Sequence, residues 1–174
     1  MSTNKHNPTR RTHGSTGYTL VEVLIIVAIL GIAASIIVPQ MLAAGTLGVQ
    51  AAARIIIADI LFAQNDAVAK QRTRKVVFDP ASESYSLTDE ADAVLSANWK
   101  GGGGNNYIVD FVNDSRFQGV VIVSADFGGA TPQTLEFDDL GGPLSGGTVE
   151  IEFQGERYRI TVASFTGRVT VDLL

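Results

Sequence analysis

The chain has 174 residues, of which 45% are hydrophobic, enough for one globular domain together with an apolar anchor. It holds no cysteine, which excludes disulfide bonds, thiolate metal sites and a cysteine nucleophile. Its formal net charge is −5; beyond residues 1–17, which contain three basic residues, 10 basic residues face 18 acidic ones, a net charge of −8. A chain this acidic repels phosphate backbones, so nucleic acid is not an expected partner.

Residues 1–17 are polar and basic, without the apolar side chains that a core needs. Both histidines, His6 and His13, lie in this segment, so the rest of the chain lacks the commonest general base and metal ligand. We therefore expect a solvated leader on the cytoplasmic side. We also expect a protein that is not an enzyme and that holds no cofactor and no metal.

Residues 18–38 form an apolar run of 21 residues, in which Glu22 is the one charged side chain. As a helix the run would be about 31 Å long, enough to cross a bilayer core. The positive-inside rule places its N-terminus in the cytoplasm. Pro39 follows directly, and a proline inside a continuing helix would kink it. We expect residues 18–39 to be a transmembrane and assembly helix.

From about residue 48 to residue 72 the pattern predicts an amphipathic helix. Its apolar positions recur at spacings of three and four: Val49, Ala52, Ile56, Ile60, Ala63 and Ala67. Asp66 and Lys70 are spaced for a favourable ion pair. The basic cluster at the helix end (Arg72, Arg74, Lys75) suits the helix dipole and favours that role over a binding patch.

After the helix the chain alternates in the manner of β-strands, separated by turn sequences. We expect hairpin turns at Asp79–Ser82, at Gly155-Glu156 and at Ser164–Gly167. The C-terminal third predicts an antiparallel meander. The fold class is therefore α+β, a long N-terminal helix packed on an antiparallel β-sheet domain of residues 40–174. The expected strands are 75–79, 84–88, 107–112, 120–124, 134–138, 148–154, 157–163 and 168–173.

Residues 89–106 form a loop that contains Trp99 and four consecutive glycines. The glycines lack the following Lys and Ser/Thr of a phosphate loop, so they indicate a flexible connection. Trp99 has two open interpretations, a contact with a partner or a core residue. Three acidic loop residues, Asp126, Asp138 and Asp139, fit no calcium-ligand spacing, which favours solvated loop acids.

The most informative segment is the junction Gly17-Tyr18-Thr19-Leu20-Val21-Glu22. A small residue ends the basic leader, an aromatic residue follows, and one carboxylate lies four residues further on. A charge at the centre of a membrane helix costs about 2.5–3.5 kcal/mol. If the chain is cleaved after Gly17, Tyr18 gains a positive amine to which Glu22 is complementary, in its own subunit or in a neighbouring one.

This junction resembles the cleavage and methylation signal of type IV pilins and type II secretion pseudopilins. The resemblance implies that a prepilin peptidase cuts between Gly17 and Tyr18 and methylates Tyr18. It also implies that Glu22 is the assembly glutamate and that Pro39 kinks the long helix. Family members usually begin with Phe, and Tyr18 departs from this mildly.

The rest of the chain resembles GspH/FimT-like minor pseudopilins. The matching stretches are Val76–Pro80, Leu135–Asp138, Gly141–Leu144 and above all Thr166-Gly167-Arg168-Val169. The resemblance implies a structural subunit of a pseudopilus or type IV pilus at or near the filament tip. It also implies other pilins, the prepilin peptidase and inner-membrane lipid as partners. The location would be the bacterial inner membrane, single-pass, with a periplasmic C-terminal domain that is extracted into the filament.

Four alternatives remain at this point. Some FimT-like proteins capture DNA through a Gly-Arg-x-Arg motif, but here the second arginine is Thr170. An ordinary signal peptide has a shorter apolar core, and an uncleaved anchor leaves Glu22 unexplained. A glycosidase-type carboxylate pair has no pattern to support it.

Thr166-Gly167-Arg168 is also a common turn sequence, so Arg168 is either structural or a partner contact.

Overall fold

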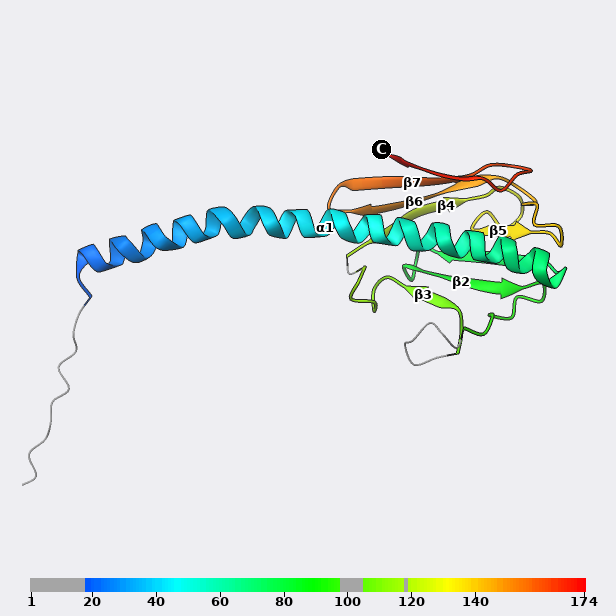
Figure 1. Ribbon diagram of the computed structural model, residues 1–174, viewed down its shortest axis with the longest axis horizontal. Coiled ribbons are helices and arrows are strands. Elements are labelled where there is room, and N and C mark those ends of the chain that lie inside the picture. Colours follow the sequence, from blue (N-terminus) through cyan, green and yellow to red (C-terminus); the bar gives the residue numbers. More distant parts are fainter. Residues whose placement is uncertain (1–17, 98–104, 118) are drawn as a thin grey trace, which may run out of the picture. The chain divides into compact units, whose positions relative to one another are not determined.

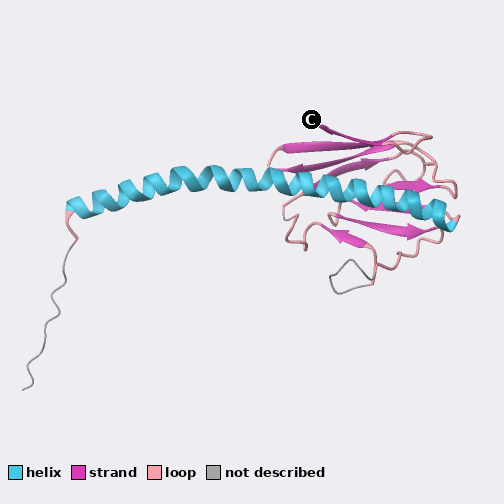
Figure 2. Cartoon of the chain, viewed as in Figure 1, coloured by secondary structure: helices cyan, strands magenta, loops and turns pink. Residues whose placement is uncertain are grey.

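The computed structural model describes residues 18–97, 105–117 and 119–174, and in the long helix it leaves out the side chains of residues 36–47. The chain divides into two units, Met1–Gln40 and Met41–Leu174. One helix, α1, runs over Leu20–Lys70 through both (Figure 1). The strands follow in the second unit (Figure 2): β1 Arg74–Asp79, β2 Ser84–Asp89, β3 Ile108–Asp110, β4 Val121–Asp126, β5 Thr134–Phe137, β6 Gly147–Phe153, β7 Glu156–Val162 and β8 Val169–Leu173.

The strands form two four-stranded antiparallel sheets in the orders β3-β2-β1-β5 and β4-β6-β7-β8. The predicted α+β class and the eight strands are confirmed, with strand ends displaced by at most two residues. The division of the strands into two sheets was not specified by the sequence. Strand periodicity identifies the buried face of each strand but does not specify its partner. Here β1 pairs with β5 and β4 pairs with β6, in both cases after a long separation in sequence.

Helix α1 is continuous where the sequence suggested two segments, since residues 39–48 are also helical. It ends at Lys70, two residues before the expected end. Gln71 has φ 51°, and the amides of Gln71 and Arg72 donate to the carbonyls of Val68 (3.3 Å) and Ala67 (3.1 Å). These two bonds make a Schellman motif, which satisfies carbonyls that a helix end otherwise leaves free.

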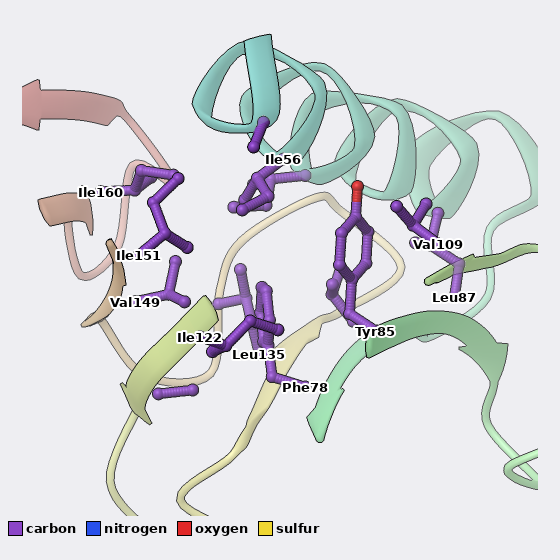
Figure 3. Close-up of a cluster of buried hydrophobic side chains, with 14 of the residues drawn as sticks. Ile56, Phe78, Tyr85, Leu87, Val109, Ile122, Leu135, Val149, Ile151 and Ile160 are labelled. Atoms are coloured by element: carbon purple, nitrogen blue, oxygen red, sulfur yellow. The ribbon is translucent and has the colours of Figure 1, made fainter. Parts of the chain in front are cut away.

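The buried face of α1 is shared between the two sheets. All six apolar positions predicted from the 3.6-residue period are fully buried: Val49, Ala52, Ile56, Ile60, Ala63 and Ala67. Figure 3 shows Ile56 above side chains from both sheets, with Tyr85 and Leu87 from one and Ile151 and Ile160 from the other. These residues belong to one hydrophobic cluster. The two sheets are therefore joined through the helix into a single core.

The hairpin between β6 and β7 turns one residue earlier than expected. Gln154 and Gly155 both have positive φ, 50° and 88°, and Phe153 pairs with Glu156. Positive φ at both central residues defines a type I′ turn, which matches the right-handed twist of the strands. The predicted Gly155-Glu156 turn was wrong because it assigned the first strand residue, Glu156, to the turn.

A carboxylate lies on the buried face of α1. Asp59 is 5% exposed, and its two oxygens accept hydrogen bonds of 2.7 Å from the hydroxyls of Tyr85 and Tyr107. Burial and the adjacent carboxylate raise the pKa of both tyrosines above the ordinary value for a phenol. Asp59 lies three residues after Ile56 and four before Ala63, so the helical period alone places it in the core.

The raised pKa values of Tyr85 and Tyr107 predict a loss of stability in alkali. The unfolded chain releases both protons near pH 10, whereas the folded chain retains them. Their stabilising contribution is therefore complete below about pH 10 and declines as the pH rises above it. We expect the free energy of unfolding to fall in that range, and phenolate absorbance to show these two tyrosines ionising only on unfolding. Tyr18→Phe, which removes an exposed phenol, should leave this loss of stability unchanged. Ionisation of Tyr85 and Tyr107 near pH 10 in the folded chain would contradict the prediction.

Candidate functional site

The start of α1 carries the features of a helix N-cap. Thr19 precedes the first helical residue, and its hydroxyl accepts a hydrogen bond from the amide of Glu22 at 3.2 Å. Its carbonyl accepts from the amide of Val23 at 3.2 Å. A threonine cap with a glutamate three residues later is the capping-box sequence. Glu22 therefore has a structural interpretation that the sequence analysis missed, beside the one in assembly. Gly17 lies outside the described residues, and Tyr18 is 77% exposed.

The first part of α1 is apolar on all sides and exposed. Ten large apolar side chains are exposed between Leu20 and Ile32, the most exposed being Leu20 at 81%. Covering a side chain of this kind gains about 1.5–3 kcal/mol, hence on the order of 15–30 kcal/mol for the set. The desolvation of the Glu22 charge costs only about 2.5–3.5 kcal/mol at the membrane centre, much less than the free energy gained by covering the apolar side chains. The segment therefore gains stability when an apolar surround covers its side chains.

Taken over the residues that the structure describes, no helix is both long and apolar enough to cross a membrane. The expected span ends at residue 38, and the side chains of residues 36–38 lie outside the described set. Pro39 lies within α1, and its side chain is likewise outside that set.

Further along α1, Gln64 joins the two sheets at their loops. Its Nε2 donates to the carbonyl of Gly141 at 2.8 Å and to the carbonyl of Thr166 at 3.4 Å. Gly141 belongs to the loop that follows β5 in the first sheet, and Thr166 to the turn between β7 and β8 in the second. The C-terminal stretches singled out in the sequence, Gly141–Leu144 and Thr166–Val169, thus meet at one side chain of the helix.

Two glycines permit this close approach. Gly141 has φ +81°, and a Cβ there would lie 2.6 Å from Val68 Cγ2. Gly167 has φ +65°, and a Cβ there would lie 2.5 Å from Gln64 Nε2. Any other residue would strain the backbone and displace the helix side chains. Thr166 and Gly167 therefore have structural roles.

The same two loops expose apolar side chains. Leu140 is 83% exposed and Phe165 is 90% exposed, each next to a residue that Gln64 holds. Arg168 is exposed as well, and within the described part of the chain its guanidinium has no hydrogen bond or ion pair. This position leaves Arg168 available as a partner contact, whereas its amide and carbonyl serve the turn.

The acidic residues of the loops serve the backbone. Asp138 Oδ1 accepts hydrogen bonds from the amides of Leu140 (3.0 Å) and Gly142 (2.7 Å). The same pattern, a carboxylate bonded to the amide two residues on, recurs at Asp79, Asp89, Asp110, Asp114 and Asp126. At Asp110, hydrogen bonds from the side chain and amide of Asn113 lower the carboxyl pKa. Much of the negative charge is thereby explained by turn formation.

The basic cluster at the end of α1 is a helix-end structure. Arg74 is buried, and its Nε lies 2.6 Å from Asp66 Oδ2. Asp66 thus pairs with Arg74, eight residues on, where the sequence analysis suggested Lys70. A groove of about 390 Å³ lies beside this pair, lined by Phe62, Asp66, Lys70, Arg74, Leu95 and Ser96. Trp99 lies outside the described residues.

Comparison with known proteins gives one sequence match. Residues 13–38 match the prokaryotic N-terminal methylation motif. No curated protein matches the chain. The expected prepilin-type signal is thereby confirmed, whereas the cleavage position and the roles of Gly17, Tyr18, Glu22 and Pro39 stay predictions. The chain thus combines a prepilin-type methylation motif with a long helix and an antiparallel β-domain.

Two solved structures are similar to the chain. One is the minor pseudopilin EpsH from the type 2 secretion system of Vibrio cholerae, with 19% identity, 72% of this chain and 94% of that chain covered, and a TM-score of 0.48. The other is the type IV minor pilin FimU of Pseudomonas aeruginosa, with 16% identity, 71% and 87% covered, and a TM-score of 0.48. Likenesses of this size do not assign a system or a partner.

Replacement of Gln64 tests the junction of the two sheets. Gln64→Ala removes both hydrogen bonds and leaves two loop carbonyls without their donor, which should lower the free energy of unfolding by about 1–3 kcal/mol. Amide exchange should increase in residues 138–142 and 164–168 together. Asn65→Ala, an exposed neighbour on the same helix, is the matched control. Equal stability of the two variants would show that Gln64 does not join the sheets.

Proposed function

We propose that this protein is a minor pseudopilin or minor pilin, a structural subunit of a type II secretion-like pseudopilus or type IV pilus. The observation that carries the proposal is the methylation motif at residues 13–38 together with the exposed apolar helix from Leu20 onward. The motif supports processing by a prepilin peptidase, and the helix supports assembly with the apolar helices of other pilins. The subunit acts by packing and has no catalytic role.

Processing removes residues 1–17 by cleavage between Gly17 and Tyr18, and Tyr18 becomes the N-methylated first residue. Two observations support this boundary. Tyr18 is largely exposed, and the helix begins two residues later, at Leu20, behind the Thr19 cap. Tyr18, on the C-terminal side of the cut, is therefore accessible and outside the helix, and the helix is already capped without the leader.

Before assembly, the apolar helix of residues 18–39 is anchored in the bacterial inner membrane, with the N-terminus cytoplasmic and the domain of residues 40–174 periplasmic. The supporting observation is that ten large apolar side chains need cover. Extraction into a filament exchanges lipid for the helices of neighbouring subunits. In the filament, the subunit lies at or near the tip. Its long helix is kinked at Pro39.

DNA uptake is the second candidate function, supported by the guanidinium of Arg168, which is exposed and has no ion pair among the residues that the structure describes. Two features weigh against it. Thr170 stands in place of the second arginine of the DNA-binding motif, and the chain without its leader has an excess of eight negative charges. The structural role is therefore the stronger proposal, and Arg168 and Trp99 are assigned to protein contacts.

The processing step has a direct test. Co-expression with a prepilin peptidase should yield a chain that begins at Tyr18 and carries one added methyl group, as measured by intact mass and N-terminal sequencing. Gly17→Val should block cleavage because the peptidase requires a small residue before the cut. Gly14→Val, a glycine three residues earlier in the leader, is the control and should be cleaved normally. Cleavage at a different site in the wild-type chain would refute the proposed boundary.

The role of Glu22 can be separated from helix capping by two substitutions. Glutamine can serve at the third position of a capping box, whereas alanine cannot. If the negative charge drives assembly through an amine, Glu22→Gln and Glu22→Ala should both abolish filament incorporation while cleavage stays normal. If capping is the whole role, Glu22→Gln should assemble like the wild type. Incorporation is measured by the fraction of processed subunit in sheared filaments.

A further inference from the structure

The turn between β7 and β8 holds a bulky side chain in a strained conformation. Phe165 has φ 67°, and the amide of Thr166 donates to the carbonyl of Ser164 at 2.8 Å. A hydrogen bond between residues two apart, around a central residue of positive φ, defines the rare and strained form of the γ-turn. A large side chain seldom adopts this conformation. Phe165 is also 90% exposed, so burial of its ring within the chain does not offset the strain.

The backbone around Phe165 is fixed by its own hydrogen bonds. The amide of Gly167 donates to the carbonyl of Ala163 at 3.0 Å, and the amide of Ala163 donates to the carbonyl of Arg168 at 2.9 Å. Glycine at position 165 would satisfy this turn without strain, so the fold of the chain gives no reason for a phenylalanine there. Residues that the surrounding structure holds in a strained conformation cluster at binding sites, which points to a role for the ring outside this chain.

Phe165 belongs to a group of exposed side chains around Gln64. Gln64 bonds to both loops that carry Leu140 and Phe165, and Val68 lies beside the residue that follows Leu140. Leu140 is 83% exposed and Val68 is 48% exposed. A single exposed apolar side chain is ordinary, whereas several gathered on a hydrogen-bonded framework form a surface that a partner can cover. We define the end patch as Val68, Leu140, Phe165 and Arg168.

The charges at the end patch favour a protein partner that carries a carboxylate. Arg168 is exposed and has no ion pair within the described residues. Arginine and aromatic side chains are the usual anchors of protein interfaces. Asp139, next to Leu140, is exposed as well, and the chain beyond residue 17 has an excess of eight negative charges. An anionic lipid surface would be repelled, so the complementary surface is an apolar depression with a carboxylate beside it.

The position of the end patch selects the neighbour that it can reach. Within the second unit, α1 enters at Met41 and ends at Lys70, and the end patch lies beside the last two turns of the helix. In a filament of parallel subunits, this end of one domain meets the end of the next domain at which the helix of that subunit enters. Such a head-to-tail contact keeps all helices parallel and allows a filament to continue.

We propose that the end patch is the contact with the next pilin-like subunit toward the filament tip. Phe165 inserts into an apolar depression at the helix-entry end of that subunit's domain, and Arg168 pairs with a carboxylate beside the depression. Leu140 and Val68 cover its rim. This inference rests on the proposed function. Loss of the end-patch contact leaves cleavage and methylation intact, so its failure can be told apart from failure of the proposed function.

Photo-cross-linking of the full chain locates the contact. With p-benzoylphenylalanine in place of Phe165, in cells that assemble the filament, irradiation should link the chain to a pilin-like subunit, recognised by its methylated N-terminal peptide. The linked peptide should come from the helix-entry end of that subunit's domain. The same cross-linker at Val112, which is 60% exposed at the opposite end of this domain, should not give that product. A link to phospholipid, or to the end patch of a second copy, would overturn the proposal.

Two substitutions separate binding from folding, scored with the cross-linker at position 140. Phe165→Gly removes the ring and adopts the positive φ without strain, so its thermal midpoint should be unchanged or raised. Phe165→Gly and Arg168→Glu should each lower the cross-linked fraction by roughly tenfold, as for an anchor residue of an interface. Arg54→Glu, an exposed charge reversal earlier on α1, is the control and should have no effect. Undiminished cross-linking in either end-patch variant, with the chain still cleaved and methylated, would overturn the proposal and leave the proposed function standing.

Discussion

The structure of the second unit depends on one buried stripe of helix α1. Ile56, Ile60 and Ala63 are fully buried and belong to the same cluster as side chains from both sheets. Two four-stranded sheets without a common strand need such a shared surface, because each sheet has an apolar face that must be covered. Hydrogen bonds from polar side chains of the helix then fix where each sheet lies against it. Asp59 bonds to the first sheet through two tyrosines, Gln50 bonds to Tyr158 in the second at 3.2 Å, and Gln64 bonds to loops of both.

One hydrogen bond connects the two sheets directly, without the helix. Glu83, in the turn between β1 and β2, accepts a hydrogen bond at 2.5 Å from the amide of Ile122 in β4. The register of β4 shifts directly after Ile122, so the carboxylate serves an amide at an irregular point of the ladder. Glu83 also has φ 51°, an uncommon conformation for a side chain of its kind. A strained turn residue, a shifted strand and a contact between the sheets thus coincide, which explains why the carboxylate is placed there.

The sequence predicted the local structure well and the long-range structure poorly. The helical period identified all six buried positions between Val49 and Ala67, because spacing on a helix depends only on local geometry. It did not identify the two sheets, since the partner of β4 lies more than twenty residues away and alternation is the same for every partner. Asp59 and Gln64 were missed for different reasons. Asp59 falls on the predicted apolar stripe and was detectable, whereas the acceptors of Gln64, Gly141 and Thr166, are defined only by the fold.

The N-terminal site poses a different question, which is why position 22 carries a charge. The amide of Glu22 already bonds to the Thr19 hydroxyl, and the capping-box geometry is equally open to glutamine. The favourable interaction of a carboxylate with the helix N-terminus is about 0.3–1 kcal/mol at an exposed position. Desolvation of the charge in an apolar surround costs more, about 2.5–3.5 kcal/mol at the membrane centre. Capping and the helix dipole together do not offset a cost of that size, and in the proposed processing the amine of Tyr18 would supply the compensating cation.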